Sequence, residues 1–478
     1  MDQYFIGLDV GTQGARLILV NQNGELIASD ARKFMLDEHF REEQSPAIWW
    51  KDCYEMLRNL FQQRTNDIDK NQIRAISVTS TSGTVMPLDA KNKPLHPAIM
   101  YSDGRSAEQG KRCREVALKH VKDGYTGFNA SSGISKILWF VETYPENAKH
   151  IAKWIHASDY LVGKLSGNYH ATDYTNVLKT GYDLTYFRWP KYLFEELGLQ
   201  ESWMQEVVPS GSVIGKLNNE LAIEWGIPQI NVVVGMTDGC ATQMASGAVK
   251  PGDWNTTIGT TLVIKGVTKK NVVDPLGRLY SHRHPQGYWM PGGASNTGAD
   301  WISLDFPTDL DMLNKAAEGL IPTGLLAWPL KQEGERYPIM APLARGFAPA
   351  NLSQEMLYAA NLEGVAFIER LAYEIIEELS GEKVAAIYSA GGGANSAIWL
   401  KIRASVMNVP TYKCKEASGA FGAAIMAASN TYYSSLMGAA AAMAKVEKEV
   451  LPDPELHAQY EIQYQQFKLK LKELNYIS

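Results

Sequence analysis

An acidic residue near the amino terminus is followed at once by a tight turn. Asp9 lies near the end of the apolar run 4–10, and the turn Gly11-Thr12-Gln13-Gly14 comes next. Backbone N–H groups and a hydroxyl in such a turn form a concavity that binds anions. A neighbouring carboxylate can hold Mg²⁺ through water, because Mg²⁺ keeps several waters and takes one or two carboxylates plus phosphate oxygens. We therefore expect a phosphate-binding turn with Asp9 beside it as a metal ligand.

A similar unit recurs about 250 residues later. Residues 253–258 and 262–266 are apolar runs joined by Gly259-Thr260-Thr261. Two strand–turn–strand units of this kind suggest an internal duplication, although two unrelated hairpins could share a Gly-Thr turn. Two such turns that faced each other across a cleft would hold a triphosphate from both sides.

A second acidic residue follows a buried apolar strand. The run 231–236 leads directly into Thr237-Asp238-Gly239. An acid at a strand end, next to a glycine, can meet a ligand and act as a base or a metal ligand. It can equally cap a helix over 240–246, and the local sequence favours neither interpretation over the other.

The elements that position these residues alternate along the chain, which favours an α/β architecture. Gly24 fits the tight turn of an antiparallel hairpin after the first two strands. Asp453 and Pro454 predict the start of a docking helix at the carboxyl terminus, with its aromatic residues in the core. We expect helices over 47–62, 151–162, 355–380 and 396–407 and strands over 73–77, 231–236 and 384–389.

Other phosphate-binding chemistries fit poorly. The Gly-Lys pairs at 163–164 and 215–216 are each followed by Leu and lack the leading glycine of a Walker A loop. The loop Gly391-Gly392-Gly393-Ala394-Asn395-Ser396 only partly matches a dinucleotide fingerprint, with Glu416 about 20 residues on. A P-loop NTPase and a nicotinamide enzyme are therefore minor alternatives.

Composition narrows the class of protein further. The 478 residues predict two or three domains, and a net charge of -6 makes a nucleic-acid or anionic membrane surface a poor expectation. Cys53, Cys113, Cys240 and Cys414 form no Cys-x-x-Cys motif, so we expect free thiols and a reducing cytoplasm. No apolar stretch is long enough for a membrane span, and MDQYFIGLDV has no signal-peptide pattern.

Taken in order, the motifs resemble those of the FGGY carbohydrate kinases, and the resemblance spans nearly the whole chain. The segments that carry it are Asp9-Val10-Gly11-Thr12, Tyr101-Ser102-Asp103-Gly104-Arg105, Lys136-Ile137-Leu138-Trp139, 235–239, Ile258-Gly259-Thr260-Thr261, Gly334-Glu335-Arg336-Tyr337-Pro338, Ala344-Arg345-Gly346 and 391–393. This family is the sugar-kinase branch of the actin/Hsp70/hexokinase ATPase superfamily. The resemblance implies an α/β protein with two ribonuclease H-like domains, over 1–245 and 246–478, flanking a central cleft that holds ATP, Mg²⁺ and a sugar.

The resemblance also implies roles for individual residues. Asp238 would be the catalytic base that accepts the proton of a terminal sugar hydroxyl, and it would share the metal with Asp9. A homodimer is an expectation from the family alone. The expected ATP- and phosphate-binding residues are Gly11, Thr12, Gln13, Arg16, Gly259, Thr260, Thr261, Gly391, Gly392, Gly393 and Asn395.

The sugar is predicted from one short loop. Thr81-Ser82-Gly83 looks like the Thr-Ser-Gly-Thr of a ribulose-kinase-like subgroup, where small hydroxyls can bind sugar hydroxyls; the loop can also merely satisfy its own backbone. Asp103 could bind sugar hydroxyls or pair with Arg105. Lys136 and Trp139 are expected to orient their surroundings, and ion pairing is the expected role of Arg336 and Arg345.

We therefore expect a ketopentose kinase, with D-ribulose ahead of D-xylulose. The alternatives are a kinase for another polyol or sugar acid (glycerol, erythritol or gluconate) and a non-kinase ATPase of the same superfamily.

Overall fold

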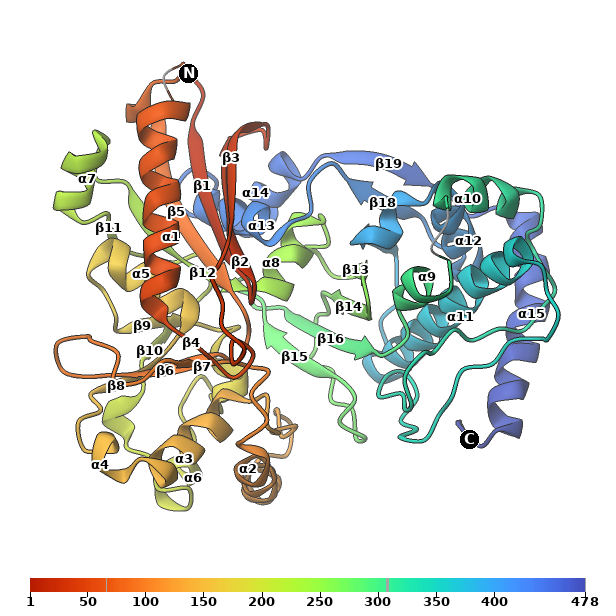
Figure 1. Ribbon diagram of the computed structural model, residues 1–478, viewed down its shortest axis with the longest axis horizontal. Helices are drawn as coiled ribbons and strands as arrows, with labels where there is room; N and C mark the ends of the chain where they lie inside the picture. Colours follow the sequence, from red (N-terminus) through yellow and green to blue (C-terminus); the bar gives the residue numbers. More distant parts are fainter. Residues whose placement is uncertain (66, 307–308, 478) are drawn as a thin grey trace. The chain divides into compact units, whose positions relative to one another are not determined.

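The computed structural model describes residues 1–65, 67–306 and 309–477, and these form two compact units (Figure 1). Unit 1 contains Met1–Ala245, His282–Tyr288 and Glu416–Lys445. Unit 2 contains Ser246–Ser281, Trp289–Lys415 and the described residues from Val446 onward. Two segments that follow residue 245 in the chain thus return to unit 1, which a contiguous division into 1–245 and 246–478 does not capture.

Unit 1 is built on a mixed six-stranded sheet. Its strands, in spatial order, are β11 (Val213–Lys216), β12 (Asn231–Thr237), β5 (Ile73–Ser80), β1 (Tyr4–Val10), β2 (Gly14–Asn21) and β3 (Leu26–Lys33). The strands β12, β5 and β1 run parallel to one another, and β1, β2 and β3 form an antiparallel meander. The central strand β12 is an almost unbroken apolar run, as expected for a parallel strand buried on both faces.

Helices cover this sheet and extend unit 1. They are α1 (Pro46–Asn59), α2 (Ala107–His120), α3 (Gly133–Thr143), α4 (Pro145–Ala148), α5 (Ala157–Ser166), α6 (Tyr192–Glu195), α7 (Asn219–Trp225), α8 (Asp238–Ala245), α13 (Gly419–Ala428) and α14 (Leu436–Met443). Helix α13 packs directly on β1, so closely that a Cβ atom on Gly7 would lie 1.9 Å from the carbonyl oxygen of Ala420. Only glycine fits at that position.

Two small sheets complete unit 1. One has the order β4 (Glu43–Gln44), β7 (Ala98–Ile99), β6 (Val85–Leu88) and β8 (Lys153–His156). The other pairs β10 (Glu206–Val208) with β9 (Ala171–Asp173) in parallel.

Unit 2 repeats the central arrangement of unit 1. Its sheet has seven strands, of which β15 ends in two residues that belong to unit 1. In spatial order they are β15 (Tyr280–Arg283), β16 (Trp289–Ser295), β14 (Leu262–Gly266), β13 (Asp253–Ile258), β17 (Ala386–Ala390), β18 (Thr411–Cys414) and β19 (Val446–Val450). Strands β13, β14 and β16 form the meander, and β17 and β18 run parallel to β13, in the manner of β1, β2, β3, β5 and β12. The predicted duplication and the two-domain α/β class are confirmed.

The helices of unit 2 pack around a large aromatic core. They are α9 (Asp300–Asp305), α10 (Leu310–Glu318), α11 (Gln354–Ser380), α12 (Ala397–Met407) and α15 (Pro454–Glu473). Asp453 caps α15 by accepting hydrogen bonds from two backbone N–H groups, as predicted. Tyr460, Tyr464 and Phe467 of this helix are fully buried, which confirms that its aromatic residues belong to the core.

One predicted helix is wrong in its first half. Residues 153–156 form β8, and only from Ala157 does the chain become helical. Lys153 to His156 pair with β6, so sheet pairing determines the conformation of this stretch in preference to its helical pattern.

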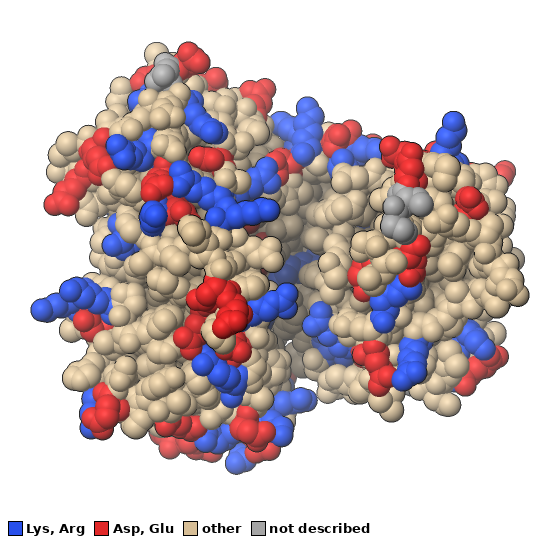
Figure 2. All heavy atoms as spheres, in the orientation of Figure 1, with Lys and Arg blue, Asp and Glu red and all other residues tan. Residues whose placement is uncertain are grey.

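Two global features bear on the expected partners. Among the described residues, no helix combines the length and hydrophobicity needed to cross a membrane. Figure 2 shows basic and acidic side chains interspersed over the face in view, so that face has no field of a single sign.

The four cysteines are buried and free, which confirms the expectation of free thiols.

Candidate functional site

The candidate residues of unit 1 gather at one edge of its main sheet. Strands β1, β5 and β12 are parallel neighbours, so their carboxyl ends meet at the same edge. Asp9 pairs in register with Thr79 of β5, and Thr237 of β12 pairs with Ser80. Asp9 near the end of β1, the loop after β5 and Asp238 after β12 therefore lie at three adjacent strand ends.

Asp9 has the electrostatics of a ligand-binding carboxylate. Burial, and to a smaller extent the negative charge of Asp238, raise its pKa to about 7, while the positive charge of Arg16 acts in the opposite direction. Its Oδ1 atom is buried and has no hydrogen-bond partner. A buried acceptor without a donor is a costly arrangement that a cation or a ligand proton relieves. Two neighbouring carboxylates, one with such an oxygen, fit the few protein ligands that Mg²⁺ takes.

The first Gly-Thr turn is held by its own backbone and by neighbouring strands. Gly11 N donates to Gly14 O at 3.0 Å, and the Gln44 side-chain amide donates to Thr12 O at 2.8 Å. Arg16 forms an exposed ion pair with Glu416 at 3.2 Å, and its charge acts on Asp9. Helix α13 begins beside Asp9, where a Cβ atom on Gly419 would lie 2.5 Å from Asp9 Oδ2.

The second acid, Asp238, opens α8. Its Oδ1 atom accepts the N–H of Gly239, the next residue, at 2.7 Å. A capping side chain normally accepts from the N2 or N3 residue of its helix, so this contact is not the usual cap. Asp238 is partly exposed, in keeping with a residue that meets a ligand.

The loop after β5 presents small hydroxyls. The hydroxyls of Thr81 and Thr84 lie 2.8 Å apart, and Thr84 also accepts the N–H of Tyr101. Ser82 Oγ is buried and has no hydrogen-bond partner. Gly83 has a φ of 86°, and a Cβ atom there would lie 2.4 Å from Ser131 O, so the turn requires glycine. The loop does not fully satisfy its own polar groups, which leaves Ser82 able to bind a ligand.

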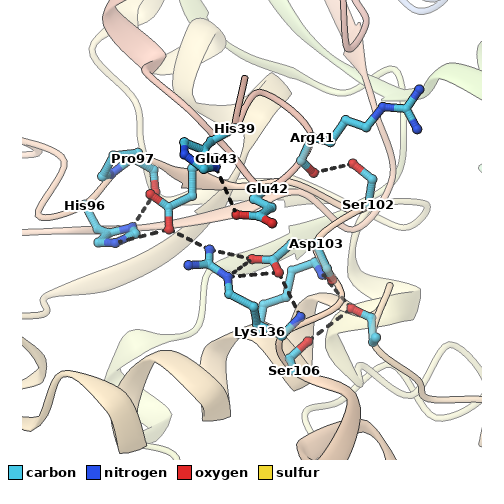
Figure 3. Close-up of polar contacts among 12 residues, drawn as sticks. His39, Arg41, Glu42, Glu43, His96, Pro97, Ser102, Asp103, Ser106 and Lys136 are labelled. Atoms are coloured by element: carbon cyan, nitrogen blue, oxygen red, sulfur yellow. Dashed lines mark hydrogen bonds and ion pairs between the residues drawn. The ribbon is translucent and has the colours of Figure 1, made fainter. Parts of the chain in front are cut away.

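Asp103, which is labelled in Figure 3, pairs with Arg105, one of the two predicted alternatives. Its carboxylate is almost completely buried and accepts from Arg105 Nε at 3.0 Å through each oxygen. Arg105 in turn reaches Glu43 at 2.5 Å and lies over the ring of Trp139. Direct contact of Asp103 with a sugar stays a prediction.

Lys136 holds the backbone of the Asp103 segment in place. Its ammonium donates to the carbonyl oxygens of Asp103 at 2.9 Å and Ala130 at 2.5 Å. Burial lowers the pKa of Lys136 to about 8. These contacts agree with the predicted orienting role of Lys136 and Trp139.

In unit 2 the second turn and the glycine loop follow neighbouring parallel strands, β13 and β17. Gly259 N donates to Thr261 O at 3.0 Å, and a Cβ atom on Gly298 would lie 2.3 Å from Thr260 O. Gly391 has a φ of 78° and packs against Ile258 O. These close backbone contacts hold both loops at one edge of the sheet.

Two further candidates of the glycine loop line open space. A Cβ atom on Gly392 would meet nothing within 4 Å. Asn395 lines a polar cavity of about 280 Å³ together with Ala394, Leu400, Lys413, Glu447 and Lys448. The loop thus has room beside it for a ligand within unit 2.

Glu335 is a buried carboxylate whose role was missed. It accepts from Ser295 Oγ and Asn296 N, each at 2.7 Å, and from Thr297 Oγ1 at 2.8 Å. Gly298, the next residue, lies against the Thr260 turn. The Gly334-Glu335-Arg336 stretch is noticeable in the sequence, but its partners lie about 40 residues upstream, and no spacing points to them. Arg345 forms an ion pair with Glu333, as predicted.

Comparison with known proteins places this geometry in context. Residues 4–245 match the model of the N-terminal domain of the FGGY family of carbohydrate kinases, and residues 254–431 match that of its C-terminal domain. A gluconokinase of Bacillus licheniformis is 28% identical over 432 residues, covering 85% of this chain and 83% of that protein. A xylulose kinase of Bacillus subtilis is 25% identical over 455 residues, covering 89% and 88%.

The fold is shared with solved structures. A structure described as a xyloylose kinase from Brucella ovis superposes with a TM-score of 0.88 at 24% identity, over 99% of both chains. At this identity the likeness concerns the fold.

Proposed function

Because this chain belongs to the FGGY family of carbohydrate kinases, we propose that it transfers the γ-phosphoryl group of ATP to the terminal hydroxyl of a ketopentose, with D-ribulose ahead of D-xylulose. The observation that carries the proposal is the sheet edge of unit 1. There Asp9, Ser82 and Asp238 belong to or follow three adjacent parallel strands. Ser82 Oγ, buried without a partner, supports a polyhydroxylated acceptor.

Asp238 is the proposed catalytic base. It accepts the proton of the attacking hydroxyl as that oxygen bonds to the γ-phosphorus and the bond to the β-phosphate oxygen breaks, releasing ADP. A carboxylate is a weak base toward an alcohol, but phosphoryl transfer has a loose transition state in which the proton leaves late. Asp238 therefore works mainly by orienting the hydroxyl.

The remaining residues bind and neutralise phosphate charge. Asp9 and Asp238 are the proposed Mg²⁺ ligands, and the ion would neutralise charge on the phosphates when bound. The Gly11-Thr12-Gln13 turn and Arg16 in unit 1, and the Thr260-Thr261 turn in unit 2, are proposed to donate to phosphate oxygens. The glycine loop and Asn395 are proposed to bind the adenosine end, because the polar cavity lies beside them.

Gluconate is the second candidate substrate. Two observations favour it: a relative at 28% identity is named a gluconokinase, and Lys179 runs beside the loop after β5. The Cδ atom of Lys179 lies 3.5 Å from the position of a Cβ atom on Gly83. An ammonium there would complement the carboxylate of a sugar acid, which a ketopentose lacks.

A substrate panel tests the proposal. ADP release from Mg-ATP would be measured with D-ribulose, D- and L-xylulose, L-ribulose, glycerol, erythritol, ribitol and gluconate. The proposal expects the highest kcat/KM with D-ribulose. A gluconate response that falls at least tenfold in Lys179→Met, with glycerol inactive in both proteins, would replace the ketopentose with the sugar acid. ATP hydrolysis at the same rate with and without every sugar would contradict the kinase assignment.

A further inference from the structure

The peptide unit that joins Met236 and Thr237, one residue before Asp238, is held from both sides by buried threonine hydroxyls. The Met236 carbonyl oxygen accepts from Thr79 Oγ1 at 2.6 Å. The N–H of Thr237, which belongs to the same peptide unit, donates to Thr175 Oγ1 at 2.8 Å. Thr79 and Thr175 are both completely buried. Water therefore does not compete for either group.

The two hydroxyls come from different elements of unit 1. Thr79 lies on β5, directly in register with Asp9 of β1. Thr175 follows β9, 62 residues before its partner. The peptide unit is thus tied both to the strand next to Asp9 and to the small β9–β10 sheet.

The Thr175 hydroxyl has a fixed polarity. It donates its one proton to Asp173 Oδ2 at 2.8 Å, so its lone pairs face the N–H of Thr237. Asp173 is itself held by Ser210 Oγ at 2.6 Å and by the Asn176 side-chain amide at 2.5 Å. Hydrogen bonds that run in one direction through a buried network polarise one another and fix the position of each member.

Side chains are needed here because the strand ladder is interrupted. The pairing of β12 with β5 shifts register between Val234 and Thr237. Gly235 lies in this interval, where a Cβ atom would be 2.0 Å from Val78 O. The last peptide of β12 therefore receives both of these contacts from side chains, and the orientation of that peptide sets the direction in which the chain enters Asp238.

We propose that Thr79 and Thr175 are positioning residues for phosphoryl transfer, which clamp the Met236–Thr237 peptide and so aim the Asp238 carboxylate at the acceptor hydroxyl. The inference rests on the proposed role of Asp238 as the base. A small displacement of a catalytic group lowers kcat more than it weakens substrate binding. Loss of the clamp should therefore separate kcat from KM.

The test uses the full-length protein with Mg-ATP and the sugar that gives the fastest ADP release. Thr175→Val and Thr79→Val remove one hydroxyl each at nearly constant volume, and Thr175→Ser restores the hydroxyl. Thr172→Val is the matched control, because Thr172 is a buried threonine of β9 whose hydroxyl contacts His156 at 3.1 Å, outside the clamp. Each variant is also made in an Asp238→Asn background, and thermal unfolding midpoints are recorded for all.

The clamp predicts that Thr175→Val lowers kcat about 10- to 100-fold while KM for sugar and ATP changes less than about threefold. Thr175→Ser should recover at least half of kcat, and Thr172→Val should keep it. In the Asp238→Asn background Thr175→Val should have no further effect, since its influence passes through that carboxylate.

Two results would overturn the clamp alone. One is a Thr175→Val variant with kcat within twofold of the parent. The other is an equal loss with and without the Asp238 carboxylate, which would show a merely structural effect. Full activity of Asp238→Asn by itself would instead overturn the proposed function, because catalysis would then not require the Asp238 carboxylate as a base.

Discussion

Asp9 and Asp238 flank β5 at one sheet edge, and the negative charge of Asp238 acts on Asp9. Together with burial, which is the larger cause, this charge raises the pKa of Asp9 to about 7. The ligand-free protein therefore keeps two acids together at a cost that a bound cation would offset. The two carboxylates proposed to bind the metal therefore lower the stability of the ligand-free protein.

Asp9→Asn should stabilise the ligand-free protein and abolish its kinase activity. The substitution removes a buried charge whose pKa lies about three units above its ordinary value, which corresponds to about 2–4 kcal/mol in the free energy of unfolding at pH 8. Urea unfolding without Mg²⁺ or ATP measures the gain, and an ADP-release assay measures the loss. An Asp9→Asn protein that is less stable than the parent would show that Asp9 is a structural residue.

Gly419→Ala should lower activity through Asp9. The added Cβ atom would lie 2.5 Å from Asp9 Oδ2, so the carboxylate must move. We expect kcat/KM for Mg-ATP to fall at least tenfold. Gly438→Ala is the control, because Gly438 is exposed near the start of α14, and the nearest atom to its Cβ position is the Ser435 hydroxyl at 3.1 Å. Equal activity of the two variants would contradict the account of Asp9.

Titration of Lys136 should make the free energy of unfolding increase with pH in the alkaline range. Burial lowers its pKa to about 8 in the folded state, against 10.5 in the unfolded chain. Between these values the unfolded state binds the extra proton, so the free energy of unfolding rises with pH. The difference between the parent and Lys136→Met should increase by about 2–3 kcal/mol from pH 7.5 to 10.5. A difference that stays constant over this range would show that the buried amine does not titrate there.

Glu335→Gln should weaken the second phosphate turn. The amide nitrogen is a donor, so it leaves buried donors around Ser295–Thr297 without an acceptor, at about 1–3 kcal/mol of stability. We expect KM for ATP to rise severalfold. Glu333→Gln is the control, since Glu333 pairs with the exposed Arg345 and such pairs contribute little. An unchanged KM for ATP in Glu335→Gln would separate Glu335 from the turn.

Local patterns were sufficient to predict much of the fold. The apolar runs and glycine turns predicted the first meander and two of the three strands of the second, and the strand before Asp238 was recognisable because its burial on both faces makes it continuously apolar. The first half of the helix expected over 151–162 is wrong because the pairing of β8 with β6 depends on residues more than 60 positions away.

Contacts over long sequence separations explain what the sequence did not indicate at the site. The Asp103–Arg105 pair was one of two open alternatives, because neighbours in sequence can either pair or bind a ligand. Thr79 and Thr175 meet the Met236–Thr237 peptide over separations of 157 and 62 residues, and single threonines carry no pattern that signals such contacts. Residues 416–445 return to unit 1 because α13 packs on β1, which is also a contact over a long sequence separation.

The central claim is that Asp238 is the base for transfer to a sugar hydroxyl, and Asp238→Asn tests it most directly. Steady-state ADP release and equilibrium binding of ATP would be measured side by side, with the best sugar and saturating Mg²⁺. The account predicts a kcat at least about 100-fold lower, with ATP binding within about threefold of the parent. A kcat equal to that of the parent, at equal ATP binding, would contradict it and leave Asp238 as the first residue of α8 without a chemical role.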